Sequence, residues 1–425
     1  QSEDRSNKGP KMTDENNSQQ LDRADTRVRY DEGISGALRD LIDRTRSGDL
    51  GILPVLVGLI LISVVFTLLN PVFLAPINLA NLLFDASAVG FIALGIIFVL
   101  LLGEIDLSVG SMSGLASAMI GVLWVETGLP LPLAIVGALA AGALVGLLFG
   151  LLRNRFDMPS FVATLAGLLT LLGLQLYILG PTGSINLPFT SPLVRFGQLL
   201  IMPAWLSYTL AILPGLLLIY GGIMAAKRRN KANLSYTNLN VTALKAVMIT
   251  AVLLFSVYYL EKGRGVPWMF AIFTFVVMCA EYALTRTKWG RSMFAIGGNA
   301  EAARRSGINV DSIRMTAFVL CSTFAALGGV FSSARLASAS IQAGTGDVNL
   351  NAIAAAVIGG TSLFGGRGSA WSALLGVLVI MAISNGLTLL NLNSSLRFMI
   401  TGGVLAFAVI VDSIARRSRA SHGRA

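Results

Sequence analysis

The stretch GEIDLSVGS places two carboxylates, Glu104 and Asp106, where two apolar runs meet. Carboxylates inside a membrane are costly and often bind substrate or relay protons, although at the cytoplasmic surface these two would cost little. Gly103 and Gly110 would permit a broken or re-entrant helix around them. Asp106, beside Ser108, would then cap the following half-helix. We favour this capping role over direct substrate or proton binding, because Asp and Ser are common helix caps.

A second group with possible chemistry is the glycine-rich stretch AAVIGGTSLFGGRGS at 355–369, which includes Gly359 and Gly360. Glycine-rich loops bind phosphates when a lysine follows the glycine, as in the phosphate-binding loop of nucleotide hydrolases. No Gly-Lys dipeptide occurs in this chain. The pattern therefore predicts an unwound or tightly packed membrane segment, and it does not predict a nucleotide site.

A third group is the charged stretch AIGGNAEAARRSGINV, which interrupts two long apolar runs. Asn299 suits a helix N-cap, and Glu301 falls in the first turn, near the positive end of the helix dipole. Arg304 and Arg305 fall in the last turn, and Gly307 suits the left-handed stop. The sequence thus predicts a short helix over roughly residues 300–306.

A helix of about two turns is not stable alone in water, so another element must hold this one. Its position favours either a simple surface turn or a docking element for another protein. Glu301 and Arg304 are three residues apart and are expected to form a weak pair on one face.

The elements that position these groups are membrane helices. The chain has 425 residues, of which 54% are hydrophobic and 13% charged, with a net charge of +10. A soluble domain carries about 25% charged residues, so we expect an all-α polytopic membrane protein. The positive charges sit in short loops between apolar runs, which excludes nucleic-acid binding as their explanation. The single histidine, His422, excludes a His-based metal cluster or catalytic triad, and we assign no catalytic, cofactor or metal residues.

A membrane-spanning helix needs about 20 mostly apolar residues. We expect a bundle of about 12 spans, within a range of 10 to 12, including one or two broken or re-entrant glycine-rich segments. The candidate spans are 50–69, 84–102, 110–127, 131–152, 160–180, 204–226, 239–260, 266–284, 313–335, 349–364, 370–390 and 397–415. Glycines 142, 146 and 150 share a four-residue spacing, which indicates close helix packing.

The distribution of basic residues predicts the orientation. With both termini in the cytoplasm, 27 of the 32 Lys and Arg residues lie on the cytoplasmic side, as the positive-inside rule requires. Residues 1–49 form a polar tail, mostly disordered, with an amphipathic interfacial helix at about 34–46. Residues 50–415 form the transmembrane domain, and 416–425 form a basic cytoplasmic tail. Glu281 is expected to reach the inner surface or pair with Arg286.

Four stretches resemble one family. In chain order, EIDLSVGSMSGL, MPSFVATLAG, TRTKWGRSMFAIGGNAEAARRSGINV and LNAIAAAVIGGTSLFGG are similar to the permease subunits of bacterial ABC importers for pentoses and hexoses. The stretches LPLPL and RGVP and the extra pair of spans at 204–260 most resemble the D-xylose permeases of that family. The resemblance implies a multi-pass protein of the bacterial inner membrane that works as a homodimer in the lipid bilayer. It also implies a cytoplasmic ATP-binding subunit and a periplasmic sugar-binding protein as partners.

By the same resemblance, the short helix at about 299–307 is the coupling helix that contacts the ATP-binding subunit. The residues assigned to it are Gly298, Asn299, Glu301, Ala302, Arg304, Ser306 and Gly307. The chain itself is then no enzyme, because ATP hydrolysis belongs to the separate subunit.

Three alternatives differ in class or in solute. An ABC permease could carry ribose, galactose or a branched-chain amino acid, because nothing in the spans identifies a sugar. A proton- or sodium-driven transporter would need an ionisable site at mid-membrane, for which Glu104 and Asp106 are the candidates. A membrane enzyme ranks last, because the sequence offers no convincing nucleophile and base.

Overall fold

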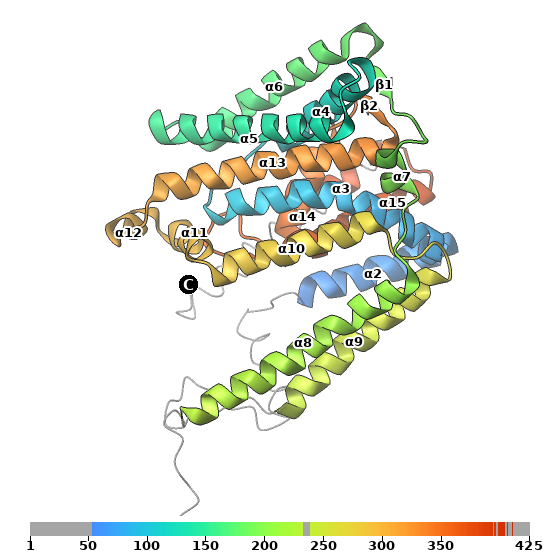
Figure 1. The fold of residues 1–425 in the computed structure, drawn as a ribbon, viewed down its shortest axis with the longest axis vertical. Helices are drawn as coiled ribbons and strands as arrows, with labels where there is room; N and C mark the ends of the chain where they lie inside the picture. The colour runs from blue at the N-terminus through green and yellow to red at the C-terminus, as the bar shows by residue number, and fades with distance from the viewer. Residues whose placement is uncertain are drawn as a thin grey trace, which may run out of the picture. The chain divides into compact units, whose positions relative to one another are not determined.

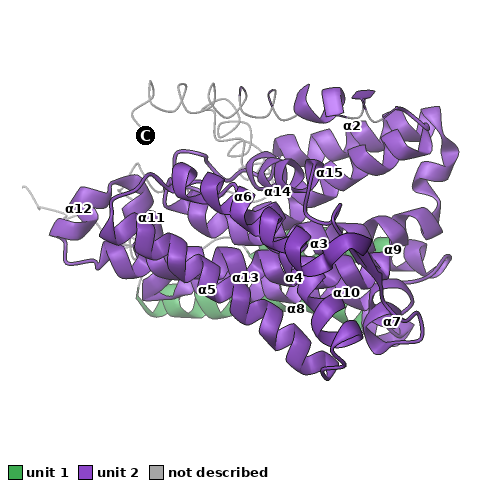
Figure 2. Cartoon of the chain, turned by 90° about the horizontal axis from the view of Figure 1, so that it is seen from above, with its two compact units in different colours: residues 1–46, 208–256 green, residues 47–207, 257–425 purple. Residues whose placement is uncertain are grey.

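The computed structural model describes residues 53–232 and 239–393, together with residues 395, 396, 398–403, 406 and 410. The expected tails at 1–49, including the helix at 34–46, and at 416–425 lie outside the described residues, as does most of the expected span 397–415. The chain divides into two compact units, residues 1–46 with 208–256 and residues 47–207 with 257–425 (Figure 2).

The described residues are almost entirely helical, as lipid requires of a chain that must satisfy its backbone hydrogen bonds internally. The longer helices are α2 (Leu53–Leu69), α3 (Pro76–Leu101), α4 (Val109–Ile120), α5 (Leu131–Arg155), α6 (Ser160–Leu179), α8 (Ala204–Lys231), α9 (Leu239–Glu261), α10 (Trp268–Arg286), α11 (Lys288–Gly298), α13 (Val310–Leu336), α14 (Asp347–Ile358) and α15 (Trp371–Leu389). The short ones are α7 (Pro192–Gln198), α12 (Ala300–Arg305), the 3₁₀ turns η1 (Pro71–Leu74) and η3 (Gly180–Thr182), and the π-helical turn η2 (Gly121–Glu126). Two strands, β1 (Ser184–Asn186) and β2 (Ser338–Ser340), pair antiparallel with Ser184 opposite Ser340.

Nine helices among the described residues are long and apolar enough to cross a membrane, which confirms the all-α polytopic prediction. The expected span 349–364 is wrong. The helix there, α14, has only 12 residues, because Gly359 and Gly360 follow it and Gly360 takes a left-handed φ of 104°. This segment is therefore interrupted, as the glycine-rich stretch predicts. Within the expected span 50–69, helix α2 covers all of the described residues, Leu53–Leu69.

In the larger unit, α13 packs against α3, α4 and α5 (Figure 1). Helix α3 is largely buried, whereas α5 and α6 leave much apolar surface exposed, as helices facing lipid do. The predicted packing role of the regularly spaced glycines is confirmed. A side chain at Gly142 or Gly146 would collide with the backbone of α13 at Ser322 or Phe318. In the smaller unit, Gly215 of α8 lies against Thr250 of α9.

Candidate functional site

The charged stretch forms a short helix bounded by local caps. The Asn299 side chain accepts a hydrogen bond from the Ala302 N–H at 2.9 Å and begins α12. Gly307, with φ of 86°, follows the helix, and Asn309 caps the next helix, α13, by accepting from the Ser312 N–H at 3.0 Å. The predicted cap and stop are confirmed, and the helix itself covers Ala300–Arg305.

The polar residues of helix α12 face the solvent. All seven residues assigned to coupling are exposed, and only Ala303 of this helix is buried. The expected Glu301–Arg304 pair is wrong. Glu301 pairs instead with Arg305 at 3.2 Å, one full turn along the helix, and Arg304 reaches Asp311 in the first turn of α13 at 3.5 Å. Arg304 therefore ties α12 to the helix that follows it.

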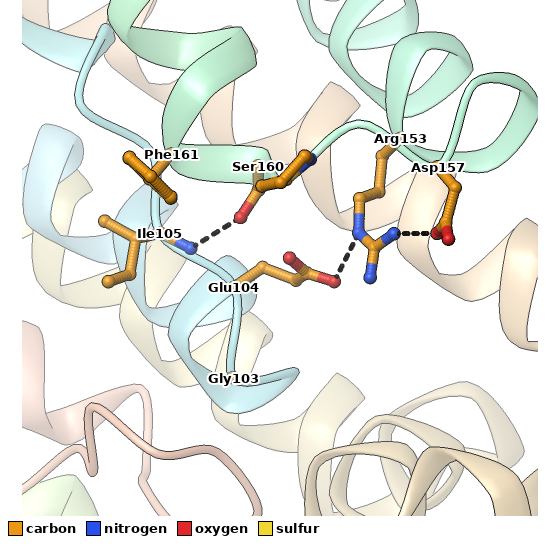
Figure 3. A pocket seen from close by; sticks show the side chains of 8 residues that line it. Gly103, Glu104, Ile105, Arg153, Asp157, Ser160 and Phe161 are labelled. Atoms are coloured by element: carbon orange, nitrogen blue, oxygen red, sulfur yellow. Dashed lines mark hydrogen bonds and ion pairs between the residues drawn. The ribbon is translucent and has the colours of Figure 1, made fainter.

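The carboxylate of Glu104 lies between two arginines from distant parts of the chain. Its Oε1 is 2.9 Å from Nε of Arg153, at the end of α5, and 3.4 Å from Nε of Arg314, near the start of α13. All three side chains are at least four-fifths buried. Arg153 also contacts the exposed Asp157 at 2.5 Å (Figure 3). The charge of Glu104 is thus neutralised by structural partners within the chain.

The helix is interrupted between α3 and α4, as predicted, and residues 102–108 between them are called the break. Gly103 takes a left-handed φ of 74° there, which favours glycine. Two backbone N–H groups of the break that have no helical partner are hydrogen-bonded by side chains in the first two turns of α6. The Ile105 N–H donates to Ser160 Oγ at 3.2 Å, and the Leu107 N–H donates to Thr164 Oγ1 at 3.1 Å. Ser160 and Thr164 are four residues apart and share one face of α6.

Asp106 is buried and turned inward. Its Oδ1 accepts hydrogen bonds from the N–H of Ser108 at 2.8 Å and from the Ser108 hydroxyl at 2.7 Å. Ser108 immediately precedes the first residue of α4, and its own side chain caps no N–H. Asp106 therefore organises the start of α4 by holding the residue before the helix. The Cys321 thiol of α13 lies beside the same carboxyl.

Gly110 has a different role from the one expected. It lies inside the first turn of α4 rather than at the break, and a side chain there would collide with the Gly344 carbonyl and with Asn349. The Asn349 amide donates to the Leu107 carbonyl at 2.7 Å. Gly110 therefore permits the segment leading into α14 to approach the break closely.

The glycine-rich stretch connects α14 to α15 through a loop that is anchored at its far end. Gly359 packs against the backbone of Ser372 in α15. The carboxylate of Glu281, in α10, accepts from the Ser369 hydroxyl at 2.7 Å and from the Ala370 N–H at 2.8 Å. Glu281 is only half-buried, and its carboxylate caps the start of α15 instead of pairing with Arg286.

Three glycine-containing segments meet beside Glu104. The Gly366 N–H donates to the Leu101 carbonyl at 2.9 Å. Side chains at Gly297 or Gly365 would collide with the backbone of the neighbouring segments, Leu101 and Gly103 among them. The break, the glycine-rich loop and the last turn of α11 therefore approach one another at backbone distance.

A surface hollow of about 360 Å³ opens at this place and is lined by Gly103, Glu104, Ile105, Arg153, Asp157, Pro159, Ser160 and Phe161 (Figure 3). The lining contains no nucleophile paired with a base. The described residues contain no group of three side chains suited to bind a metal. The chemistry available here is ion pairing and backbone hydrogen bonding, which suits mechanical linkage better than catalysis.

Sequence reasoning missed four of these residues: Arg153, Arg314, Ser160 and Thr164. In the sequence, the two arginines were used only in the count of cytoplasmic basic residues. The stretch MPSFVATLAG, which contains Ser160 and Thr164, was used only as evidence for the family resemblance. Two signals were available in the sequence. The arginines lie at the ends of apolar helices while the break carries acidic residues, and Ser160 and Thr164 are four residues apart on an otherwise apolar helix.

The chain matches known proteins over most of its length. Residues 78–409 match the family model described as "Branched-chain amino acid transport system / permease component". The chain is 33% identical over 374 residues to the xylose transport system permease protein XylH of Escherichia coli strain K12, covering 88% of this chain and 94% of that protein. It is 32% identical over 346 residues to the protein of the same name from Haemophilus influenzae, covering 80% of this chain and 90% of that protein.

A ribose permease is similar to the same degree. The ribose import permease protein RbsC of Escherichia coli strain K12 is 32% identical over 357 residues, covering 84% of this chain and 91% of that protein. No solved structure matches the chain significantly. The family match and these relatives agree with the apolar helices of the fold. The chain therefore belongs to this family of transport-system permease components, and it is a multi-pass protein of the bacterial cytoplasmic membrane.

Proposed function

We propose that this chain is the membrane subunit of an ATP-driven importer of D-xylose or a related monosaccharide, and that it forms the path by which the sugar crosses the membrane. The relatives named for xylose and ribose support this proposal. Membrane subunits of this family work with a cytoplasmic ATP-binding subunit and a periplasmic binding protein. In our proposal the ATP-binding subunit hydrolyses ATP, and two copies of this chain form the membrane part.

The observation that carries the proposal is the exposed, capped helix α12. A helix of six residues has too few internal hydrogen bonds to be stable alone, and Ala303 is its only buried residue. Its charged residues are largely solvent-exposed. Such a helix is well suited to fit a groove of the ATP-binding subunit and to pass on the motion of that subunit as a rigid body.

The proposed orientation agrees with this role. Both termini lie in the cytoplasm, because 27 of 32 basic residues then lie on the cytoplasmic side. Helix α12 lies in the most basic loop between spans and therefore faces the ATP-binding subunit. The transmembrane domain extends over residues 50–415, and residues 1–49 and 416–425 are cytoplasmic tails.

The decisive experiment is reconstitution of the chain with the ATP-binding subunit and the sugar-binding protein encoded beside it, followed by uptake of labelled D-xylose. ATP-dependent uptake that excess unlabelled D-xylose abolishes, and excess ribose does not, is the expected result. Competition by ribose or by a branched-chain amino acid instead would reassign the solute. Uptake driven by a proton or sodium gradient without ATP would refute the importer class.

The same preparation tests the coupling residues. In Arg304→Ala the exposed pair with Asp311 is lost, which costs at most about 1 kcal/mol, so folding and membrane insertion should stay normal. Loss of a charge from a desolvated subunit interface costs about 2–5 kcal/mol, so uptake should fall sharply. Glu301→Ala should behave alike, and Gly307→Val should be at least as severe because valine obstructs the left-handed φ. Normal transport in all three variants would leave α12 as a plain connector.

A gradient-driven transporter is disfavoured by the partners of the two carboxylates that are its candidates, Glu104 and Asp106. Glu104 is paired with Arg153 and Arg314, and Asp106 is bonded to Ser108. Both carboxylates therefore already have structural partners.

A further inference from the structure

We propose that Glu104 is the positioning residue that links the coupling helix to the break between α3 and α4. The link is the ion triad Arg153–Glu104–Arg314. This inference rests on the proposed function, because it takes α12 to be the element that the ATP-binding subunit moves.

The first observation is that α12 and the start of α13 are joined. Arg304 of α12 reaches Asp311 at 3.5 Å, and Asp311 lies in the first turn of α13. The Asn154 amide, at the end of α5, donates to the Asp311 carbonyl at 2.7 Å. The firmer link is the short connection between the two helices, in which the Ile308 N–H donates to the Ala303 carbonyl of α12 at 3.1 Å. A displacement of α12 is therefore passed to the first turn of α13 and, through Asn154, to the end of α5.

The second observation is that these two helix ends hold the same carboxylate. Arg314 lies one turn beyond the first residues of α13, and Arg153 lies in the last turn of α5. Both contact Oε1 of Glu104, at 3.4 Å and 2.9 Å. The triad is mostly buried, and breaking a buried pair by removal of one partner is far more costly than breaking a surface pair. The triad therefore moves as one body with the helix ends.

The third observation is a second anchor on the other side of α12. Helix α11 ends at Gly298, directly before the cap residue of α12. Gly297 lies against the Leu101 carbonyl and the Gly366 backbone, with no room for a side chain. The segment α11–α12–α13 thus contacts the break on both sides of α12. On the α11 side the contact is the backbone of Gly297 at Leu101, directly before the break, and on the α13 side it is the pair of Arg314 with Glu104.

The break is an element that can respond to such a displacement. Its first residues stay bonded to the end of α3, where the Glu104 N–H donates to the Val99 carbonyl at 3.2 Å. The residues after Glu104 are held by Ser160 and Thr164 of α6 and by the Asp106 side chain. A shift of Glu104 changes the position of this segment and hence the start of α4. If Glu104 only stabilised the fold, its replacement would instead lower stability and all activities alike. The two roles differ in whether ATP hydrolysis and transport remain coupled.

The test uses the complete importer, reconstituted in proteoliposomes with its ATP-binding subunit and sugar-binding protein. Three quantities are measured for each variant: ATP hydrolysis without the sugar-loaded binding protein, its stimulation by that protein, and sugar transported per ATP hydrolysed. In the Glu104→Gln complexes that assemble we expect basal hydrolysis to continue, because ATP is hydrolysed in the separate ATP-binding subunit. Stimulation and the transport ratio should fall by about tenfold, within the range of about 5- to 150-fold typical of coupling between sites.

The matched control is Asp157→Asn. Asp157 is the second carboxylate that contacts Arg153, and its side chain is almost fully exposed. Stimulation and transport ratio should stay within about twofold of the wild type, because exposed pairs contribute little. A loss in Asp157→Asn as large as that in Glu104→Gln would overturn the assignment to Glu104.

A double-mutant cycle separates the link from independent effects. If motion passes through the pair, Glu104→Gln combined with Arg314→Gln should lose no more coupling than either single variant. Additive losses would overturn the link. Should Glu104→Gln fail to assemble, Glu104→Asp keeps the charge and shortens its reach, and it should give an intermediate transport ratio. An unchanged ratio in Glu104→Asp would then overturn the proposal.

The outcomes also distinguish the link from the proposed function. A wild-type complex that neither hydrolyses ATP nor transports sugar means that the proposed function fails. A functional wild-type complex whose Glu104→Gln variant keeps the normal transport ratio per assembled complex means that only the link fails.

Discussion

Replacement of Asp106 by Asn and by Leu separates a structural carboxylate from one that carries ions. Oδ1 of Asp106 accepts two hydrogen bonds, from the N–H and from the hydroxyl of Ser108, at 2.8 and 2.7 Å. Both residues are at most 1% exposed. Water therefore cannot replace these hydrogen bonds when the acceptor is removed.

The magnitudes follow from the number of donors left unpaired. In Asp106→Leu the two Ser108 donors lose their acceptor, and each buried unpaired donor costs about 1–3 kcal/mol. Asp106→Asn keeps an acceptor oxygen for both donors, but its NH₂ replaces Oδ2, which has no hydrogen-bond partner, so we expect a cost of about 1–3 kcal/mol, less than that of two unpaired donors. Asn should therefore retain much of the stability and most of the uptake, whereas Leu should lose both.

The assay is thermal unfolding of the purified chain in detergent, paired with sugar uptake by the reconstituted complex. Asp157→Asn is the control, because this side chain is 94% exposed and asparagine, like aspartate, tolerates the left-handed φ of 48° at this position. The reasoning is refuted if Asp106→Asn unfolds at the wild-type temperature and yet loses uptake as completely as Asp106→Leu. That result would mean that the charge itself is needed for transport.

Three further predictions concern other parts of the chain. The purified chain alone should neither bind nor hydrolyse ATP, because it has no Gly-Lys phosphate loop; turnover by a preparation free of contaminating ATPases would contradict the assignment. A cysteine placed at position 232, after replacement of Cys279 and Cys321, should resist an impermeant reagent added outside intact spheroplasts, since the distribution of basic residues predicts that this loop is cytoplasmic; labelling from outside would refute the orientation. Gly146→Leu should destabilise the chain by about 1–3 kcal/mol or more, because the side chain would collide with the α13 backbone, whereas Gly137→Leu on the same helix, where only the tip of a leucine side chain lies nearby, should be far milder; equal unfolding temperatures would refute this packing argument.

The sequence alone was sufficient for features that depend on neighbouring residues. Asn299 caps α12 through the N–H of Ala302 only three residues away, and Gly307 stops that helix through its own φ. Hydropathy and length predicted the long spans, and the four-residue spacing of Gly142 and Gly146 predicted close helix packing. In each case the interacting atoms, or the periodicity that aligns them, belong to one short segment.

The sequence was insufficient wherever two candidates of similar chemistry competed. Glu301 has an arginine three and another four residues along the chain, and the helix geometry selected Arg305 while Arg304 turned to Asp311. Glu281 had Arg286 nearby in sequence, yet it caps α15, far along the chain. A charged side chain with several partners in reach takes the one that the packing of other helices brings to it.

The central role of Glu104 was decided by tertiary structure. Its partners are Arg153, at the end of one span, and Arg314, near the start of another, and each was counted in the sequence only as a cytoplasmic positive charge. The packing of α5 against α13, made possible by glycines that bring the two backbones together, brings both guanidinium groups to one carboxylate. Local patterns specify which helices form, whereas the meeting of three helix ends depends on how those helices pack, which no single segment encodes.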